Sequence, residues 1–429
     1  MTNERLINSI DQHREEIVEF LQKLVQFNTE VSEYGRIGNE GEAQEFVADY
    51  FKKMNLEVDV FEPDNKRIRK YFGFMPGHIY KNRPNVVGTL KGKGKGRSLI
   101  LNAHMDTVPA GPVSEWKHDP FGGETENGRI YGRGVGDDKG GLTAAIMAVK
   151  AIRDTGISLG GNIILESVVD EEGEGNGTLS CCDRGYKADA AIVVDSIDPI
   201  TDVWVAHPGV TVFRLKAKGR PGHYCLKYTP QQGISAIDKM RVILDGLDKF
   251  QTERLAYIRD REYFPRVPII GVDKICGGEY RAVFPESCYI EAGFDYFSSE
   301  IGKKHDDSLI REKIEERIRK IEQGDNWLRE NPSSIEWLAS ILPVIIDKQH
   351  SVVRVLKDNI EKIAGCANLV PGKTTNDARH LFHITNVPVI SWSCGGQAVH
   401  GIDESIEIED LIKATKILAL AIKDWCGGK

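Results

Sequence analysis

The sequence lacks the features that would place the protein in a membrane or on nucleic acid. It contains no run of about 18 apolar residues, so no membrane-spanning helix is predicted. The net charge is −8 and no block of basic residues occurs, which argues against nucleic acid as the main partner. Residues 1–26 are charged throughout and have no apolar segment typical of a signal peptide. We therefore expect a cytoplasmic protein without nucleic-acid or membrane partners.

Two further absences concern cysteines and nucleotides. The eight cysteines are scattered and form no C-x-x-C pair, which is typical of reduced thiols in a cytosolic protein. The glycine-rich stretch 132–136 has its third glycine at the wrong spacing for a G-x-G-x-x-G dinucleotide motif, and no phosphate-binding G-K-[ST] motif occurs. The sequence therefore does not predict nucleotide binding.

The pattern of apolar residues predicts two domains, one inserted into the other. A chain of 429 residues is too long for one ordinary core. Up to about residue 207, short apolar strands alternate with helices, which favours a mixed α/β sheet flanked by helices. From residue 208 the strands alternate between apolar and polar residues, as in a smaller α+β unit, and the α/β pattern returns late in the chain. We predict a catalytic domain made of residues 1–207 and 343–429, with residues 208–342 inserted.

Acidic residues and histidines follow several predicted strands or begin a helix. These candidates are His104, Asp137, Glu171 with Glu172, Asp195 and His400. Ligands of open α/β sheets bind outside the carboxyl ends of the strands, so we expect these side chains to meet at one edge. Asp106 lies two residues after His104, on the same side of the chain, where a carboxylate can orient an imidazole.

Each candidate alone has a structural interpretation. A histidine at a strand end can be satisfied within the core, Asp137 can cap a helix, and an acidic turn can simply face solvent. Together, two imidazoles and several carboxylates suit two divalent metal ions, with zinc favoured and cobalt or manganese as alternatives. In the pair Glu171–Glu172, one carboxylate can bind metal while its neighbour takes a proton from the attacking water.

Taken together, these residues resemble the M20 metallopeptidase family, which contains acetylornithine deacetylase, succinyl-diaminopimelate desuccinylase, aminoacylase and carboxypeptidases. The matching segments, in chain order, are His104-Met105-Asp106-Thr107-Val108-Pro109, Asp119-Pro120-Phe121, Gly132-Arg133-Gly134-Val135-Gly136-Asp137-Asp138-Lys139-Gly140-Gly141, Asp170-Glu171-Glu172-Gly173, Asp195 and His400. An aspartate at position 195 is similar to the deacetylase and desuccinylase branch.

The resemblance implies a role for each candidate in a two-metal site. Asp137 would bridge the metals, with Asp138 as the competing bridge. The remaining metal ligands would be His104 and Asp195 on one ion, and Glu172 and His400 on the other. Asp106 would orient His104, and Glu171 would act as general base and then general acid.

The resemblance also gives an expectation for the inserted domain. It implies a ferredoxin-like α+β lid, often used for dimerisation, and hence a homodimer. Within Gly219–His223, His223 would reach the substrate carbonyl, the alternative being an ordinary surface histidine. Within Asn376–Arg379, Arg379 would hold a substrate carboxylate, the alternative being a structural ion pair.

Two parts of the predicted lid depart from the family pattern. The segment 281–285 lacks an expected asparagine, and the segment 293–297 lacks an expected arginine. We therefore expect a dinuclear metal-dependent amidohydrolase that removes an acetyl, succinyl or formyl type of acyl group from an N-acyl amino acid or related amine. The alternative is a dipeptidase or metallo-exopeptidase of the same fold acting on short peptides.

Overall fold

The computed structural model describes residues 2–229, 232–254, 256, 258–264, 269–303 and 305–427. The contacts between residues divide the chain into two units. The first unit comprises Met1–Ala206 and Ile346–Lys429, and the inserted unit comprises His207–Ile345. Each unit is described by itself.

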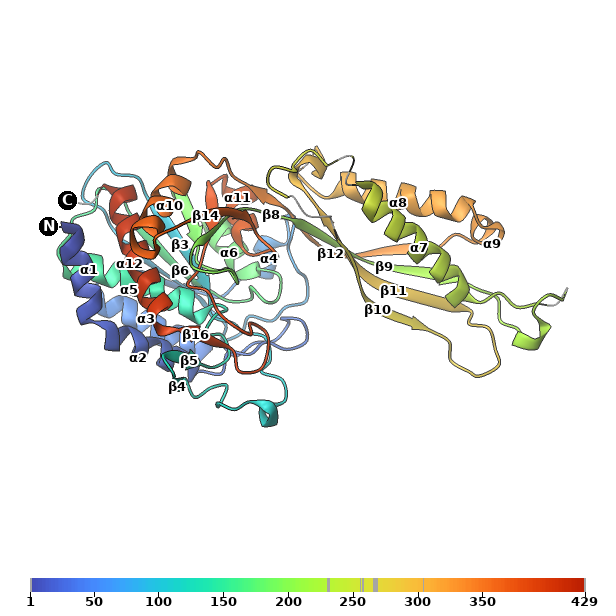
Figure 1. Ribbon diagram of the computed structural model, residues 1–429, viewed down its shortest axis with the longest axis horizontal. Coiled ribbons are helices and arrows are strands. Elements are labelled where there is room, and N and C mark those ends of the chain that lie inside the picture. The colour runs from blue at the N-terminus through green and yellow to red at the C-terminus, as the bar shows by residue number, and fades with distance from the viewer. Residues whose placement is uncertain are drawn as a thin grey trace. The chain divides into compact units, whose positions relative to one another are not determined.

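The first unit is built on eight strands of a nine-stranded mixed sheet, whose edge strand β13 lies at the end of the inserted segment (Figure 1). The strand order is β1-β2-β6-β3-β7-β15-β8-β13, with β14 paired to β8. The strands are β1 (Glu57–Phe61), β2 (Asn85–Leu90), β3 (Leu99–His104), β6 (Ile163–Val168), β7 (Ala190–Val193), β8 (Asp202–His207), β13 (Val344–Ile345), β14 (Asn368–Pro371) and β15 (Val389–Ser391). The four central strands β6, β3, β7 and β15 are parallel, whereas β2 and β8 run antiparallel on either side.

The parallel strands are buried on both faces, which explains their continuous apolar runs. Every residue of β3, β6 and β7 is buried. The crossover from β3 to β6 runs in one direction along the sheet, and the crossover from β6 to β7 runs in the other. Because such crossovers are right-handed, α5 (Lys139–Asp154) and α6 (Asn176–Arg184) cover opposite faces. The central strands consequently end at a topological switch point, where ligands bind in sheets of this kind.

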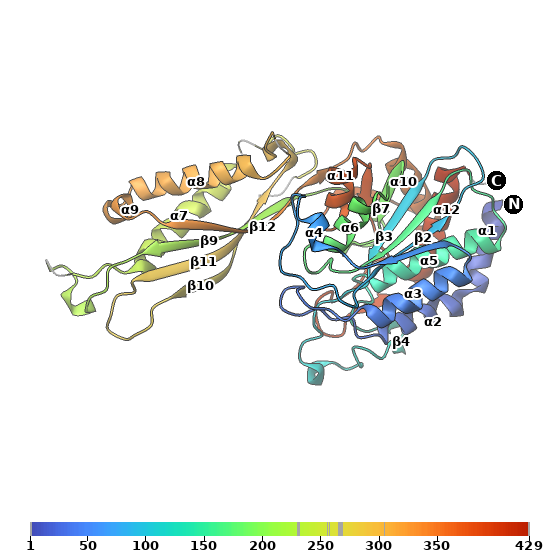
Figure 2. The same ribbon diagram turned by 180° about the vertical axis from the view of Figure 1, so that it is seen from behind.

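The remaining helices of the first unit complete these two layers (Figure 2). The helices α2 (Arg14–Val25) and α12 (Ile408–Cys426) pack against α5, and α11 (Ala378–Thr385) packs against α6. The other helices of this unit are α1 (Thr2–Gln12), α3 (Gly41–Lys53), α4 (Asn65–Ile68) and α10 (Ser351–Ala364). A small antiparallel sheet joins β4 (Thr125–Glu126), β5 (Arg129–Tyr131) and β16 (Ser405–Glu407).

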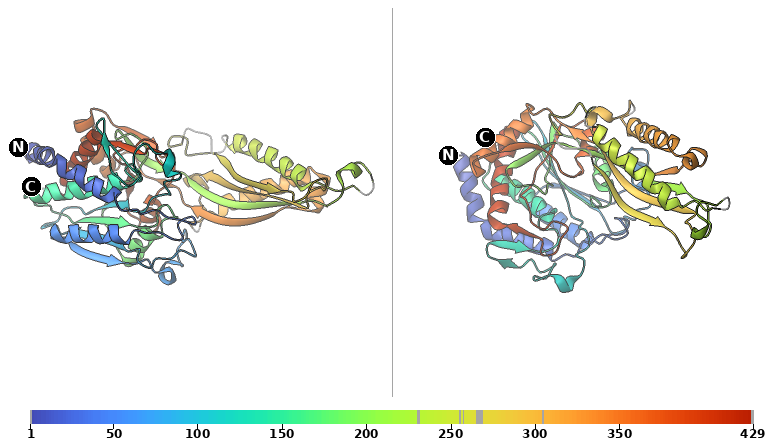
Figure 3. Two further views of the ribbon diagram at one scale, coloured as in Figure 1. Left: turned by 90° about the horizontal axis from the view of Figure 1, so that it is seen from below. Right: turned by 45° about the vertical axis from the view of Figure 1, so that its right-hand side comes forward.

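The inserted unit has the element order βαββαβ of a ferredoxin-like fold. Its elements are β9 (Gly209–Lys218), α7 (Ala236–Arg254), β10 (Ile270–Gly277), β11 (Ser287–Tyr296), α8 (Ser308–Gln323), the short α9 (Asn326–Glu330) and β12 (Ser334–Ile341). The strands form an antiparallel sheet in the order β10-β11-β9-β12, and α7 packs on it beside α8 (Figure 3). Buried and more exposed residues alternate along β9 and β11, so one face of the sheet is apolar. The predicted fold class, an α/β sheet with a separate α+β unit, is confirmed.

None of the helices among the described residues combines the length and the apolar character that crossing a membrane requires.

Candidate metal centre

The sequence candidates of the first unit converge at the carboxyl edge of the parallel strands. His104 is the last residue of β3, and Glu171 with Glu172 follows β6. Asp195 follows β7, and His400 lies in the loop after β15. Their potential ligand atoms form two groups, each with all atoms within 4.8 Å of one another: His104, Glu171 and Asp195 in one, and Asp137, Glu172 and His400 in the other.

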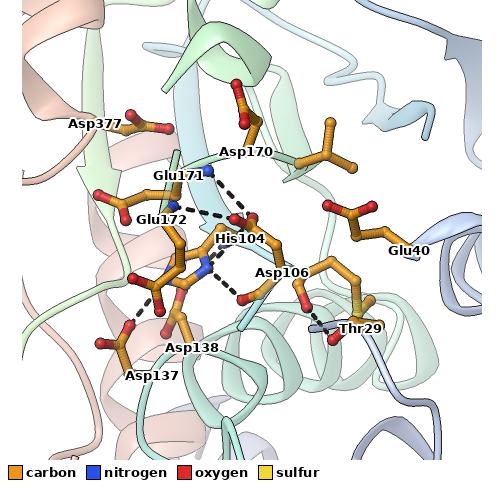
Figure 4. Close-up of polar contacts among 12 residues, drawn as sticks. Thr29, Glu40, His104, Asp106, Asp137, Asp138, Asp170, Glu171, Glu172 and Asp377 are labelled. Carbon is orange, nitrogen blue, oxygen red and sulfur yellow. Dashed lines mark hydrogen bonds and ion pairs between the residues drawn. The ribbon is translucent and has the colours of Figure 1, made fainter. Parts of the chain in front are cut away.

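The two groups meet at Asp137, which lies in the loop before α5 (Figure 4). Its Oδ1 is 2.9 Å from Nε2 of His104, and its Oδ2 is 3.2 Å from Nε2 of His400. Nε2 of His400 is also 3.1 Å from Oε1 of Glu172. The neighbouring Asp138 is buried and accepts a hydrogen bond from the backbone N–H of His104 at 3.3 Å. The geometry thus favours Asp137 over Asp138 as the carboxylate between two cations.

Asp106 connects His104 to the turn that carries the two glutamates. Nδ1 of His104 donates to the Asp106 carbonyl at 2.9 Å, which leaves the Nε2 lone pair for a metal. The Asp106 carboxylate accepts the backbone N–H groups of Glu171 and Glu172 at 3.2 and 3.0 Å. Asp106 therefore orients the imidazole through its backbone carbonyl and orients the glutamates through its side chain.

The carboxylates at this edge carry more negative charge than the neighbouring protein groups can offset. Burial, followed by the charge of Asp137, raises the pKa of Asp195 to about 8. The pKa of Glu172 is raised for the same two reasons. Burial and the neighbouring Asp195 raise the pKa of Glu171 well above its ordinary value. Such a buried surplus of carboxylates is costly unless cations compensate it.

The two imidazoles lie where a cation would replace their protons. Hydrogen bonds with Asp137 and Glu172 raise the pKa of His400 to about 10. Burial lowers the pKa of His104, but hydrogen bonds with Asp106 and Asp137 outweigh it and leave this pKa well above the usual value. Two imidazoles facing several buried carboxylates are a donor set that fits two divalent cations. The His400 side chain is 51% exposed, so it marks the solvent side of the cluster.

The segment Asn376–Arg379 supports a ligand loop. Nδ2 of Asn376 donates to the carbonyl of Asp195 at 2.9 Å. Arg379 is buried, and its Nη1 donates to the carbonyl of Asn376 at 2.8 Å, while its Nη2 lies 3.7 Å from Asp377. This placement favours the structural interpretation of Arg379 over binding of a substrate carboxylate.

His223 belongs to the inserted unit and is described within that unit alone. It is exposed, and its Nδ1 accepts a hydrogen bond from the backbone N–H of Cys225 at 3.2 Å. Its ring stacks on Tyr224 with centroids 5.1 Å apart.

Sequence reasoning missed Glu404, which secures the loop of Asp137. Its buried carboxylate accepts the backbone N–H groups of Gly134, Gly136 and Asp137 at 3.0, 2.9 and 3.2 Å. Arg133 donates to Glu404 at 2.6 Å and to the carbonyl of Gly401 at 2.9 Å. The only signal in the sequence is an acidic residue four positions after His400, which by itself does not distinguish a buried clamp from a surface charge.

Comparison with known proteins identifies the family. The sequence profile of peptidase family M20/M25/M40 matches residues 100–424. The chain belongs to this family. It is therefore an M20 metallohydrolase that cleaves amide bonds, as the motifs predict.

Relatives of this M20 enzyme extend over almost its whole length. It is 30% identical to the N-formyl-4-amino-5-aminomethyl-2-methylpyrimidine deformylase of Halalkalibacterium halodurans, an alignment that covers 99% of this chain and 97% of the relative. It is 27% identical to a succinyl-diaminopimelate desuccinylase of Rhodospirillum centenum over 78% of this chain and 83% of that one.

Solved structures share the fold of this enzyme. The crystal structure of a tripeptidase from Staphylococcus aureus matches with a TM-score of 0.73 at 19% identity, covering 96% of this chain and 99% of that chain. A dinuclear metal-binding M20 peptidase from Bacillus subtilis matches with a TM-score of 0.66 at 14% identity, covering 97% and 99%.

Proposed function

We propose that this enzyme removes the formyl group from an N-formylated aminomethylpyrimidine or a closely similar N-formyl amine. The observation that carries the proposal is the likeness to the N-formyl-4-amino-5-aminomethyl-2-methylpyrimidine deformylase, at 30% identity along nearly the whole of both chains. A second such deformylase, from Bacillus subtilis, is 29% identical over 99% of this chain.

The surroundings of Arg379 support a substrate without a carboxylate. Its guanidinium donates to the carbonyl of Asn376 and lies near Asp377, so this arginine already has partners inside the protein. The inserted unit also lacks the asparagine and the arginine that the family pattern places in segments 281–285 and 293–297. A neutral formyl amide needs no such partner for a carboxylate.

We assign the residues of the centre as follows. His104 and Asp195 would hold one divalent cation, Glu172 and His400 the other, and Asp137 would contact both. Bound cations would polarise the amide carbonyl and lower the pKa of water at the site, with zinc favoured by the two imidazoles. Cobalt and manganese remain compatible with the same ligands.

Glu171 is the proposed proton carrier. It takes a proton from the water that adds to the formyl carbon, and it gives a proton to the amine nitrogen as the C–N bond breaks. The products are formate and the free amine. A carboxylate whose pKa is raised by burial and a neighbouring carboxylate is suited to holding that proton between the two steps.

The inserted unit is proposed to complete the site. His223, exposed on this unit, would donate to the carbonyl oxygen of the substrate, in its own subunit or in the partner of a homodimer formed through this unit. We also propose that the enzyme acts in the cytoplasm, in keeping with its scattered cysteines.

A substrate panel tests the proposal. The enzyme, reconstituted with zinc, cobalt or manganese, is given the formylated aminomethylpyrimidine, N-formyl amino acids, N-acetyl amino acids, N-succinyl-diaminopimelate and dipeptides. Formate and free amine are measured separately. We expect the highest kcat/KM with the formylated pyrimidine. A higher kcat/KM with a dipeptide would favour the peptidase alternative, and one with the succinyl substrate would favour the desuccinylase branch.

A further inference from the structure

The turn that carries Glu171 and Glu172 has an unusual backbone at its first residue. Asp170 follows β6 with a φ of +69°, a left-handed conformation that few residues other than glycine adopt. The turn closes with a hydrogen bond from the N–H of Gly175 to the carbonyl of Asp170 at 2.6 Å. The Asp106 carboxylate fixes the backbone N–H groups of Glu171 and Glu172. The position of the first residue of the turn depends instead on what holds Asp170.

Two side chains from a segment without helix or strand hold Asp170. Nδ1 of His78 lies 2.9 and 3.1 Å from the two carboxylate oxygens of Asp170. The hydroxyl of Tyr80 donates to the same carboxylate at 2.6 Å. His78 and Tyr80 are 4% and 5% exposed and Asp170 is fully buried, so water does not compete for these bonds.

This contact is itself anchored on two sides. Nδ2 of Asn176, the first residue of α6, donates to the Tyr80 hydroxyl at 2.7 Å. Arg83 makes a bidentate pair with Glu40 at 2.8 Å for both bonds, and its Nη2 lies 3.6 Å from Asp170. The Tyr80 hydroxyl is therefore tied to the helix that follows the turn, and the Asp170 carboxylate lies beside the Arg83–Glu40 pair.

Close packing leaves the turn little room to move relative to Asp170 and His78. A Cβ added at Gly173 would lie 2.2 Å from the Asp170 carboxylate and 3.0 Å from Cε1 of His78. A Cβ added at Gly35 would lie 2.2 Å from Cα of Gly173. The position of the turn thus follows the position of Asp170 and its two partners.

We propose that His78 and Tyr80 are positioning residues for hydrolysis. Through Asp170 they fix the turn so that Glu172 is held at its cation and Glu171 at the attacking water. The inference rests on the roles proposed above for these two glutamates. Partners that orient metal ligands typically contribute about 10- to 100-fold to metal affinity or activity, which sets the size of the expected effect.

The test compares four variants in the metal-loaded enzyme. Tyr80→Phe removes the hydroxyl, and His78→Leu removes the ring donor. His78→Asn is the conservative variant, because its amide nitrogen occupies the place of Nδ1. The matched control is Tyr186→Phe, which removes a tyrosine hydroxyl bonded to Asp59 at 2.7 Å outside the turn. For each protein we would measure kcat and KM, the rate of metal release to a chromogenic chelator, the visible spectrum of the Co²⁺ form, and Tm.

The expected result separates positioning from simple stability. Tyr80→Phe and His78→Leu lower kcat by about 10- to 100-fold and speed metal release by a similar factor, while KM changes by less than about threefold. They also alter the Co²⁺ spectrum. His78→Asn recovers most of kcat and of the slow metal release, and Tyr186→Phe matches the wild type in both.

Two outcomes overturn the inference. Variants that lower Tm but match Tyr186→Phe in metal release and kcat would give His78 and Tyr80 a purely structural role. If His78→Leu does not fold, the pair Tyr80→Phe and His78→Asn decides by the same readouts. If the wild-type enzyme binds no metal, or if Glu172→Gln binds metal as tightly as the wild type, the proposed function is contradicted and this inference fails with it.

Discussion

The charged side chains on the inserted sheet and those at the carboxyl edge of the first unit's sheet have opposite surroundings. On the inserted unit, Arg214 of β9 lies directly opposite Glu291 of β11 and Glu336 of β12, and it bonds to them at 2.6 and 2.9 Å on the solvent face. In the first unit, the carboxylates of Glu171, Glu172 and their neighbours lie inside the protein with raised pKa values. The exposed ions of the inserted sheet pair with one another, whereas buried carboxylates without enough protein partners indicate a ligand that supplies the opposite sign.

Removing the metal ions should have the largest effect on activity and on Tm. Exhaustive chelation is expected to abolish hydrolysis and to lower Tm, because the buried carboxylates lose the charge that offsets them. Readdition of zinc, cobalt or manganese should restore both properties, as measured by activity, elemental analysis and thermal unfolding. Full activity in a protein shown to be metal-free would end the assignment of the cluster as a metal centre.

Replacing the proton carrier should come next in size. Glu171→Gln keeps the shape of the side chain but cannot carry a proton, so turnover should fall by about 10²- to 10⁴-fold. Elemental analysis should still find two cations per chain. The same substitution at the exposed Glu336 is the control and should leave turnover unchanged. Loss of metal in Glu171→Gln would contradict its role as the base and place it among the ligands.

Burial of Glu166, a carboxylate outside the ligand set, should make the free energy of unfolding depend on pH. Glu166 of β6 accepts a hydrogen bond from Asn102 at 2.9 Å, and burial raises its pKa to about 7. Its ordinary pKa is 4.5, so its contribution to stability is fully present below pH 4.5 and is lost as the pH rises through about 7. The free energy of unfolding of Glu166→Gln, measured relative to that of the wild type, should therefore be about 3 kcal/mol higher at pH 9 than at pH 4.5.

Urea unfolding of the wild type and of Glu166→Gln at the two pH values measures this gain. The matched variant is Glu291→Gln on the inserted unit, whose pKa is lowered through its hydrogen bond with Arg214, so that its contribution is lost at low pH instead. A stability difference for Glu166→Gln that is equal at both pH values would show that the fold leaves the pKa of this carboxylate at its ordinary value.

The smallest effect is expected on the solvent face of the inserted sheet. Arg214→Gln removes a cross-strand pair that water already screens, so Tm should change by less than about 2 °C and kcat should not change. Differential scanning calorimetry and the formate assay measure the two quantities. A loss of several degrees would mean that this ion network stabilises the unit far more than exposed pairs usually do.

Much of this architecture can be predicted from the pattern of apolar residues. The run Leu99–Leu101 predicts a strand buried on both faces, and the alternation at 210–218 predicts a strand with one wet face. Both periodicities follow from which faces are covered, so they are visible without a structure. Convergence of the strand ends follows in turn from parallel pairing.

Other parts of the centre depend on tertiary contacts that no periodicity encodes. The sequence places Asp137 beside Asp138, and only the loop geometry turns one toward the imidazoles and the other toward the backbone of His104. His78 and Tyr80 lie in an irregular segment where neither helix nor strand spacing applies. Likewise, the hydrogen bond from Arg379 to the carbonyl of Asn376 is not a property of either residue type.

The interrupted order of the first unit has a consequence for biosynthesis. The inserted unit, His207–Ile345, is continuous, so it can fold as soon as it leaves the ribosome, whereas the first unit needs both ends of the chain. At a synthesis rate of about 5–20 residues per second, roughly ten to forty seconds separate the emergence of Ala206 from that of His400. During that interval His400, which completes the group with Asp137 and Glu172, has not yet emerged. Cation binding by Asp137, Glu172 and His400, as proposed above, would therefore be among the late events in the making of the enzyme.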